Sequence, residues 1–262
     1  MKWEGGRKGG VEDRRGMGGA AAGGGIGVAV LALLGYLFFG VDPQTTTQVA
    51  TSLGVGGGQT QQQGAVGTPE DEAGQFVSVI GANVDDVWSK LIQDYEPPKT
   101  ILYTQGTNTG CGFGQAAMGP FYCPLDKSVY LDLTFWQEME TKLGASGAEF
   151  ARAYVIAHEY GHHVQTLLGT SEKVQRARQA ARSEAEGNKY SVAQELQADC
   201  YAGVWAAHAA EVSGGKVALE PGDLEEGMKT ANAIGDDALQ RNAGRPISPE
   251  GFTHGTSAQR VE

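Results

Sequence analysis

A stretch of 24 residues without a charge, residues 18–41, constrains this chain of 262 residues more than any other feature. Its second part, residues 26–39, is strongly apolar, and a helix of roughly 20 apolar residues crosses the hydrocarbon core of a bilayer. Five Lys or Arg residues precede the stretch, and none follows before Lys90. Because basic residues favour the cytoplasmic side of a membrane, we expect a cytoplasmic N-terminal tip at residues 1–17, a single transmembrane anchor at 18–41, and export of the rest of the chain.

Two other interpretations of residues 18–41 fit the sequence less well. A cleaved signal peptide has a shorter basic region and small residues at its cleavage site, whereas this stretch ends in Phe38-Phe39-Gly40-Val41. A helix buried in a globular domain would not normally contain so many glycines, because glycine weakens helices. We therefore expect an uncleaved anchor in the lipid bilayer. It predicts a single-pass protein of the inner, cytoplasmic membrane, with the later domain on the periplasmic or extracytoplasmic side.

The residues after the predicted anchor differ in composition. Residues 42–75 are polar and rich in Gly, Gln and Thr. They lack the apolar side chains that offset the entropy lost on ordering, so we expect a flexible linker. Residues 76–262 have regular hydrophobic patterns, which predict one domain. The net charge of −11 argues against nucleic acid as a partner, because nucleic-acid binding uses an excess of Lys and Arg.

Hydrophobic spacing predicts an α+β domain that is mainly helical, with a small sheet. Apolar and polar residues alternate over 128–133, which predicts a short strand. A second short strand is predicted at 100–104, and a Gly-rich loop at 106–125 separates the two. Helical spacing covers residues 76–95, 135–143, 147–168, 171–186, 190–211 and 223–240. Residues 241–262 have no regular pattern.

The helix predicted at 147–168 contains the pattern H-E-x-x-H, from His158 to His162. Residues four apart lie on the same face of a helix, so the two histidines can bind one metal ion. Glu159 lies about 100° further around the helix, where it can contact a water molecule beside the metal rather than the metal itself. The alternative is a group of core or surface histidines without a ligand role.

A catalytic zinc site with three protein ligands needs one more residue. A later predicted helix contains Glu195, 33 residues after His162, and Asp199, four residues further along the same face. Glu195 can complete the ligand set, and Asp199 can accept a hydrogen bond from a ligating histidine. An exposed acidic pair is the alternative for these two residues. His208 and His254 are competing third ligands, but neither has an acid at a matching spacing.

Together these motifs resemble the glutamate-ligand zincins, or gluzincins, and more closely the bacterial putative neutral zinc metallopeptidase family. The resemblance rests first on the segments 158–163 and 195–199. It extends over nearly the whole chain, because further short segments also match the family. These segments are 11–16, 119–124, 129–132, 198–203 and 252–260.

The resemblance implies a zincin-like fold and a peptidase that holds one Zn²⁺ through His158, His162 and Glu195. The zinc would lower the pKa of a water molecule and polarise a peptide carbonyl. Glu159 would act as the general base, taking the proton of the water and delivering it to the leaving amine.

Such enzymes usually have a further donor that stabilises the oxyanion. His254 is the catalytic candidate for this role, with Arg260 or Tyr201 as substitutes. By analogy with zincins, the strand at 128–133 is a candidate edge for pairing with an extended peptide; an ordinary internal strand is the alternative. We expect His163 to face away from the metal.

The positions of the cysteines are consistent with a domain that is exported from the cytoplasm. Cys111 and Cys123 are 12 residues apart in a Gly-rich segment with no nearby histidine, which favours a disulfide over a metal site. Cys200 is left without a predicted partner.

The sequence therefore predicts a membrane-anchored, extracytoplasmic zinc metallopeptidase that acts on peptides or proteins. Two alternatives share the same metal site. One is a non-catalytic zinc-binding protein that assembles or holds envelope proteins, as a chaperone does. The other is a zinc hydrolase of non-peptide amide bonds. Replacing Glu159 distinguishes an enzyme from a non-catalytic zinc protein, because only an enzyme would lose activity while keeping its metal.

Overall fold

The structure, a computed structural model, describes residues 1–16, 64–115 and 119–262. The predicted anchor at 18–41 lies outside these residues, as does most of the predicted linker at 42–75. None of the described helices is both long enough and apolar enough to span a membrane.

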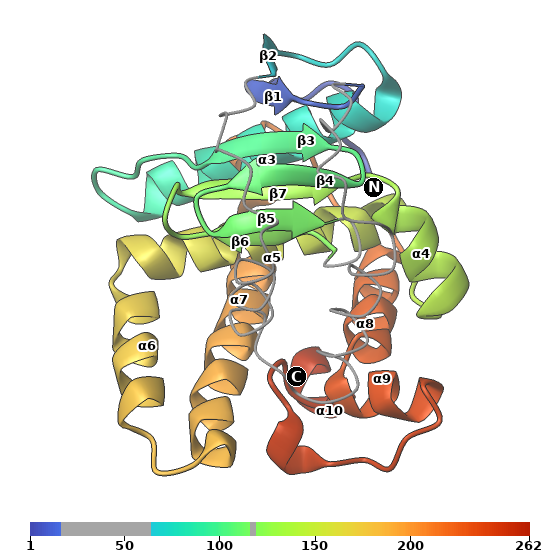
Figure 1. Ribbon diagram of the computed structural model, residues 1–262. Coiled ribbons are helices and arrows are strands. Elements are labelled where there is room, and N and C mark those ends of the chain that lie inside the picture. Colours follow the sequence, from blue (N-terminus) through green and yellow to red (C-terminus); the bar gives the residue numbers. More distant parts are fainter. Residues whose placement is uncertain (17–63, 116–118) are drawn as a thin grey trace.

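Within the described residues, a five-stranded mixed sheet lies across the upper part of Figure 1, in the order β2-β1-β3-β7-β6. The strands are β1 (Val11–Asp13), β2 (Ala65–Gly67), β3 (Lys99–Tyr103), β6 (Phe121–Cys123) and β7 (Ser128–Asp132). β1, β3 and β7 run parallel, whereas β2 and β6 pair antiparallel at the two edges. All residues of β7 are buried, as is usual for an inner strand.

A separate hairpin is formed by β4 (Gly106–Thr109) and β5 (Gly112–Gln115). Cys111 in its turn is joined to Cys123 of β6 by a disulfide bond, which confirms the predicted pairing. Cys200 is a free, exposed cysteine. The prediction of a loop at 106–125 is wrong, because β4, β5 and β6 lie in this segment. These short strands are rich in Gly and Thr and lack the apolar alternation by which strands are recognised.

The long helices α3 (Glu72–Leu91), α5 (Glu149–Leu167) and α7 (Glu184–Val212) pack against one another. Trp205 of α7 is fully buried among them. Its ring stacks on Phe150 of α5 at 6.2 Å between centroids, and its Nε1 donates to Oδ1 of Asn83 in α3 over 2.8 Å. The other helices are α4 (Phe135–Lys142), α6 (Thr170–Ala180), α8 (Asp223–Ala233), α9 (Asp236–Asn242), the 3₁₀ turn η2 (Pro249–Gly251) and α10 (Ser257–Val261). The predicted architecture, mainly helical α+β with a small sheet, is confirmed.

Two predicted segments near the C-terminus have a different structure. The helix predicted at 223–240 is divided into α8 and α9 at Gly235, whose backbone is extended (φ −68°, ψ 144°). A side chain on Gly235 would lie 2.3 Å from the backbone nitrogen of Ser257, so α10 packs directly on this turn. Residues 241–262 contain η2 and α10 and are not wholly irregular, because Thr256 and Gln259 form a capping box that starts α10.

The folded unit begins earlier than the predicted boundary at residue 76. β1 lies within residues 1–16, and β2 and the first turn of α3 lie within residues 64–75. Both segments belong to the same sheet as β3 and β7 or to the helix α3 that packs on α5. The N-terminal tip predicted at 1–17 is therefore not a separate region in its described part. A strand as short as β1 is not recognisable from hydrophobic periodicity.

Candidate metal centre

Helices α5 and α7 pack side by side and carry the residues of the candidate metal centre. His158 and His162 lie on α5, and Glu195 lies on α7. Gly161 of α5 faces α7, where a side chain would lie 3.1 Å from the carbonyl oxygen of Ala198. Because glycine has no side chain, the two helices approach closely here, which brings Glu195 next to the histidines.

The ligand atoms of these three residues converge. Nε2 of His158 lies 3.1 Å from Oε2 of Glu195, and Nε2 of His162 lies 3.4 Å from Oε1. The two Nε2 atoms are 3.2 Å apart. Ligand atoms bound tetrahedrally to one zinc ion are roughly 3.3 Å apart, so the spacing fits a single zinc ion. Among the residues that the structure describes, these are the ones grouped closely enough to hold a metal ion.

The hydrogen bonds of both imidazole rings leave Nε2 free to bind a cation. Nδ1 of His158 donates to Oδ1 of Asp199 over 2.7 Å. Nδ1 of His162 lies 3.0 Å from Oε1 of Gln165, which is the acceptor because the Gln165 amide nitrogen donates to a backbone carbonyl. With hydrogen on both Nδ1 atoms, two Nε2 lone pairs and the Glu195 carboxylate face one another. This arrangement is repulsive unless a cation lies between them.

The charges around His158 favour a cation in the same place. Burial disfavours a charged imidazole, but hydrogen bonds to Asp199 and Glu195 outweigh burial and raise the pKa of His158 to about 10. The site thus attracts a positive charge. A metal ion that binds there would displace the proton, as metals do when they bind histidine.

Asp199 holds His158 through a buried network. Its Oδ1 accepts hydrogen bonds from the Tyr154 hydroxyl at 2.5 Å and from Nη2 of Arg260 at 3.0 Å, and its Oδ2 accepts from Nε of Arg260 at 3.0 Å. Burial favours the neutral acid, but His158 and Arg260 outweigh burial and lower the pKa of Asp199 to about 2. The ionised carboxylate is therefore fixed in orientation, and it points Nε2 of His158 toward the other ligands.

Replacing Asp199 with asparagine is expected to weaken zinc binding by roughly 10–100-fold, the usual cost of losing a residue that orients a ligand. The amide is a weaker acceptor for His158, and it leaves the Arg260 charge uncompensated. Competition with a chromophoric chelator measures the affinity. Cys200→Ser is the matched control, because Cys200 is the next residue of α7 and is exposed. An unchanged zinc affinity in Asp199→Asn would show that His158 does not depend on this hydrogen bond.

Glu159 follows His158 on α5 but does not belong to the ligand group. The residue is 8% exposed, and its carboxylate makes no hydrogen bond within the described part of the chain. Burial raises the pKa of Glu159, an effect that the neighbouring His162 and His158 partly offset. A carboxylate in this environment is free to accept a proton from a water molecule.

His254 lies in the loop between η2 and α10, and Asp236 at the start of α9 shapes this loop. Oδ2 of Asp236 accepts the backbone N–H groups of His254 and of its two neighbours, over 2.7 to 2.9 Å. Oδ1 of Asp236 lies 3.3 Å from Nδ1 of His254. The His254 side chain is 40% exposed, and its charge influences the pKa of both Glu159 and Glu195. It therefore lies beside the metal centre without being part of the ligand group.

The other two histidines, His163 and His208, are not part of the ligand group. His208 is exposed, 3.4 Å from Glu211 of the same helix, and is not a third ligand. His163 is fully buried and is not part of the ligand group. Its Nε2 donates to the carbonyl oxygen of Glu96 over 2.6 Å, and its Nδ1 lies 3.1 Å from the Tyr122 hydroxyl. His163 thus ties α5 to β6 and to the segment before β3.

The two substitute oxyanion donors, Arg260 and Tyr201, lie in different surroundings. The Arg260 side chain is 4% exposed and is bound to Asp199, so a substrate oxygen does not reach it. The Tyr201 ring packs edge-on against Trp88, with 5.1 Å between centroids.

The strand predicted at 128–133 corresponds to β7 and is not a free edge. β3 and β6 occupy its two sides, so the prediction that it pairs with a peptide is wrong. The outer strand on this side is β6, which contacts α5.

Three supporting residues were not recognised from the sequence: Tyr154, Gln165 and Asp236. Gln165 is fully buried one helical turn after His162, and a polar residue at that spacing is a usable signal. Asp236 precedes His254 by 18 residues, and no local pattern connects them.

The whole chain matches a known family. The family model described as "Putative neutral zinc metallopeptidase" matches residues 1–262. The chain belongs to this family. The match confirms the resemblance carried by the segments 158–163 and 195–199, and the family description supports hydrolase chemistry with zinc.

Relatives of this chain occur in Escherichia coli and in Mycobacterium tuberculosis. Uncharacterized protein YpfJ of Escherichia coli (strain K12) is 46% identical over 277 aligned positions, which cover 99% of this chain and 92% of that protein. Uncharacterized protein Rv2575 of Mycobacterium tuberculosis (strain ATCC 25618 / H37Rv) is 43% identical over 199 positions, covering 72% and 66% of the two chains. No solved structure matches the chain.

Proposed function

We propose that the protein is a zinc peptidase that hydrolyses peptide bonds in peptide or protein substrates. The observation that carries this proposal is the convergence of two Nε2 atoms and a carboxylate at the spacing of zinc ligands. Next to them lies the Glu159 carboxylate, which has no hydrogen-bond partner among the described residues. The test is whether the purified chain hydrolyses an unfolded protein only when Glu159 is intact.

The donor set fits zinc. Two imidazoles and one carboxylate are a usual ligand set of catalytic zinc sites, in which three protein ligands leave one position open. When bound there, zinc supplies a Lewis acid that polarises a carbonyl and lowers the pKa of water. His158, His162 and Glu195 would hold it, and Asp199 and Gln165 would keep the two rings in the Nδ1–H form.

Glu159 would act on protons. Its carboxylate takes a proton from the attacking water and gives it to the nitrogen of the leaving amine. Burial, which raises its pKa, makes it a stronger base than an exposed glutamate. His254, held by Asp236, would donate from its ring to the oxygen that becomes negative in the transition state.

Replacing His254 with alanine is expected to lower kcat by roughly 10²–10³-fold, the cost of losing one oxyanion donor. The KM and the zinc content should change little, because His254 is outside the ligand group. His208→Ala is the matched control, since the His208 side chain is 40% exposed and is not part of the ligand group. Peptide hydrolysis by both variants measures the effect. A kcat in His254→Ala equal to that of the control would remove His254 from the reaction.

The Cys111–Cys123 disulfide is typical of proteins that fold in an oxidising compartment. It supports the proposal that the metal domain acts outside the cytoplasm.

A further inference from the structure

The N-terminal residues 1–16 are built into the same fold as the metal centre. β1 lies between β2 and β3: Glu12 pairs with Val66 on one side and with Ile101 on the other. Both partner strands follow the apolar stretch 18–41 in the sequence, whereas β1 precedes it. The sheet therefore contains strands that precede residues 18–41 in the sequence and strands that follow them.

Side chains of the N-terminal residues also pack into the helical part. Trp3 is 7% exposed and meets the ring of Phe76 of α3 edge-on at 5.2 Å. Its Nε1 donates to Oε1 of Glu149 of α5 over 2.8 Å. Lys2 forms two backbone hydrogen bonds with Ala218, of 2.9 and 3.0 Å. These contacts reach three different parts of the fold, so residues 1–16 are not held by the sheet alone.

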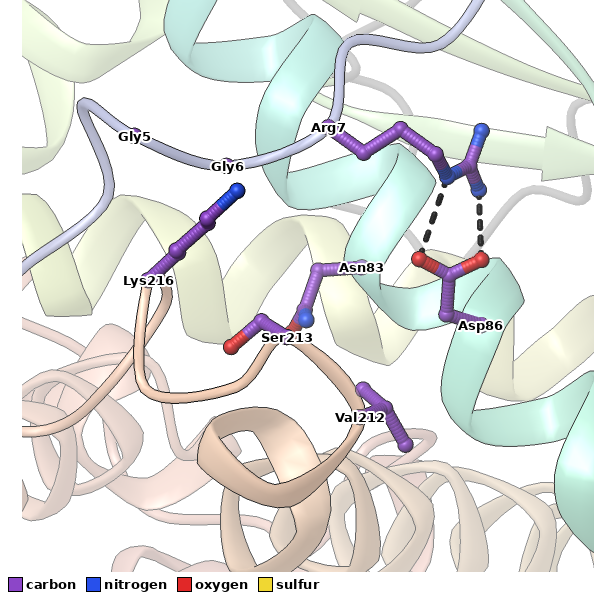
Figure 2. A pocket seen from close by; sticks show the side chains of 8 residues that line it. All are labelled: Gly5, Gly6, Arg7, Asn83, Asp86, Val212, Ser213 and Lys216. Atoms are coloured by element: carbon purple, nitrogen blue, oxygen red, sulfur yellow. Dashed lines mark hydrogen bonds and ion pairs between the residues drawn. The ribbon is translucent and has the colours of Figure 1, made fainter.

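The arginines that precede the apolar stretch have acidic partners within the fold. Arg7 binds both carboxylate oxygens of Asp86 in α3, at 2.7 and 3.1 Å, beside a cavity of about 260 Å³ (Figure 2). Arg15 binds Asp13 and Asp71, and its contact with Asp71 joins β1 to the N-terminus of α3.

A third arginine, Arg14, binds Glu12 at 2.7 Å and the carbonyl oxygen of Asn108 at 3.0 Å. The positive-inside rule counts basic residues that stay beside the membrane. Arginines paired within a folded domain have a structural reason to be present, so they no longer indicate that the N-terminus stays in the cytoplasm.

The chain leaves the sheet and returns to it at neighbouring points. Asp13 pairs with Ala65, and the backbone N–H of Gly64 donates to Oε1 of Glu12 over 3.0 Å. From these contacts we infer that residues 1–16 and 64–262 lie on the same side of any membrane to which the protein is attached. A single crossing by residues 18–41 would place β1 and β3 on opposite sides, which the pairing in the sheet forbids. The inference does not depend on zinc or on catalysis.

Thiol labelling of the full chain in cells tests this topology. Glu4→Cys and Lys173→Cys place a single reactive thiol on the N-terminal segment and on α6, where both residues are exposed. Each is made with Cys200→Ser, which removes the free cysteine. Spheroplasts are treated with a membrane-impermeant maleimide, and permeabilised spheroplasts give the maximum labelling. We expect the two thiols to be labelled to the same fraction. Labelling of Lys173→Cys with protection of Glu4→Cys would overturn the inference and restore the single-pass arrangement.

A cross-link provides an independent measurement. Glu12 and Val66 lie directly opposite each other in antiparallel strands, where side chains are about 4.5–5.5 Å apart at Cβ. The double variant Glu12→Cys/Val66→Cys, with Cys200→Ser, should form a cross-link in membranes from intact cells after mild oxidation. Val66→Cys/Lys173→Cys is the control pair that should not. Failure to cross-link, with both thiols of the test pair reactive toward maleimide, would equally overturn the inference.

Discussion

Replacing Glu159 with glutamine is expected to abolish peptide hydrolysis while zinc remains bound. Glutamine has the shape of glutamate but cannot accept the proton of the attacking water, and a general base contributes roughly 10²–10⁴-fold to the rate. Zinc should remain bound, because Glu159 is outside the group of ligand atoms. Hydrolysis of a library of unfolded protein fragments and the zinc content of the same samples measure the two effects.

The control for this experiment is Glu172→Gln, which changes an exposed glutamate of α6. It should match the wild type in both measurements. A Glu159→Gln variant as active as the wild type would contradict the assignment of the base. A wild-type chain that binds zinc and cleaves no peptide would instead favour the non-catalytic zinc protein. If the chain cleaves a non-peptide amide in a Glu159-dependent reaction but cleaves no peptide, the result would favour a zinc hydrolase of non-peptide amide bonds.

Replacing Glu195 with alanine is expected to remove most of the bound zinc. Glu195 supplies both carboxylate oxygens near the two Nε2 atoms, so its loss leaves two ligands and removes the negative charge of the site. The zinc affinity should fall by more than the roughly 10–100-fold expected for a residue that only orients a ligand. Metal analysis after dialysis and competition with a chelator measure the loss.

Glu184→Ala is the matched control, since Glu184 is an exposed glutamate of the same helix. Circular dichroism of both variants shows whether α7 is retained. An unchanged zinc content in Glu195→Ala would mean that another residue is the third ligand, and His254, the remaining histidine candidate, would be replaced next.

Much of the helical part could be predicted because its signals are local. The helix at 147–168 differs from α5 by one or two residues at each end, and its H-E-x-x-H spacing places His158 and His162 on one face. Glu195 and Asp199 share a face of α7 for the same reason. The close approach of α5 and α7 at Gly161, which brings these faces together, follows from packing and not from either helix alone.

The strands were harder to predict because a pairing partner is distant in the sequence. β3 and β7 were recognised as strands, but nothing in the sequence of β7 shows that β3 and β6 occupy both its sides. β1, β4, β5 and β6 are too short or too rich in glycine to show a period.

By itself, the sequence determined most of the long helices, the metal-ligand candidates on them, the disulfide and the family. The tertiary structure decided three further points. It brought Tyr154 and Arg260 into hydrogen-bonding contact with Asp199. It placed Asp236 where it accepts the backbone N–H of His254. It also put β1, from residues 1–16, into a sheet with strands that follow the apolar stretch 18–41 in the sequence. The physical reason is the range of the interactions. Helical periodicity is repeated every few residues along one segment, whereas ion pairs and strand pairing join residues that only the folded chain brings together.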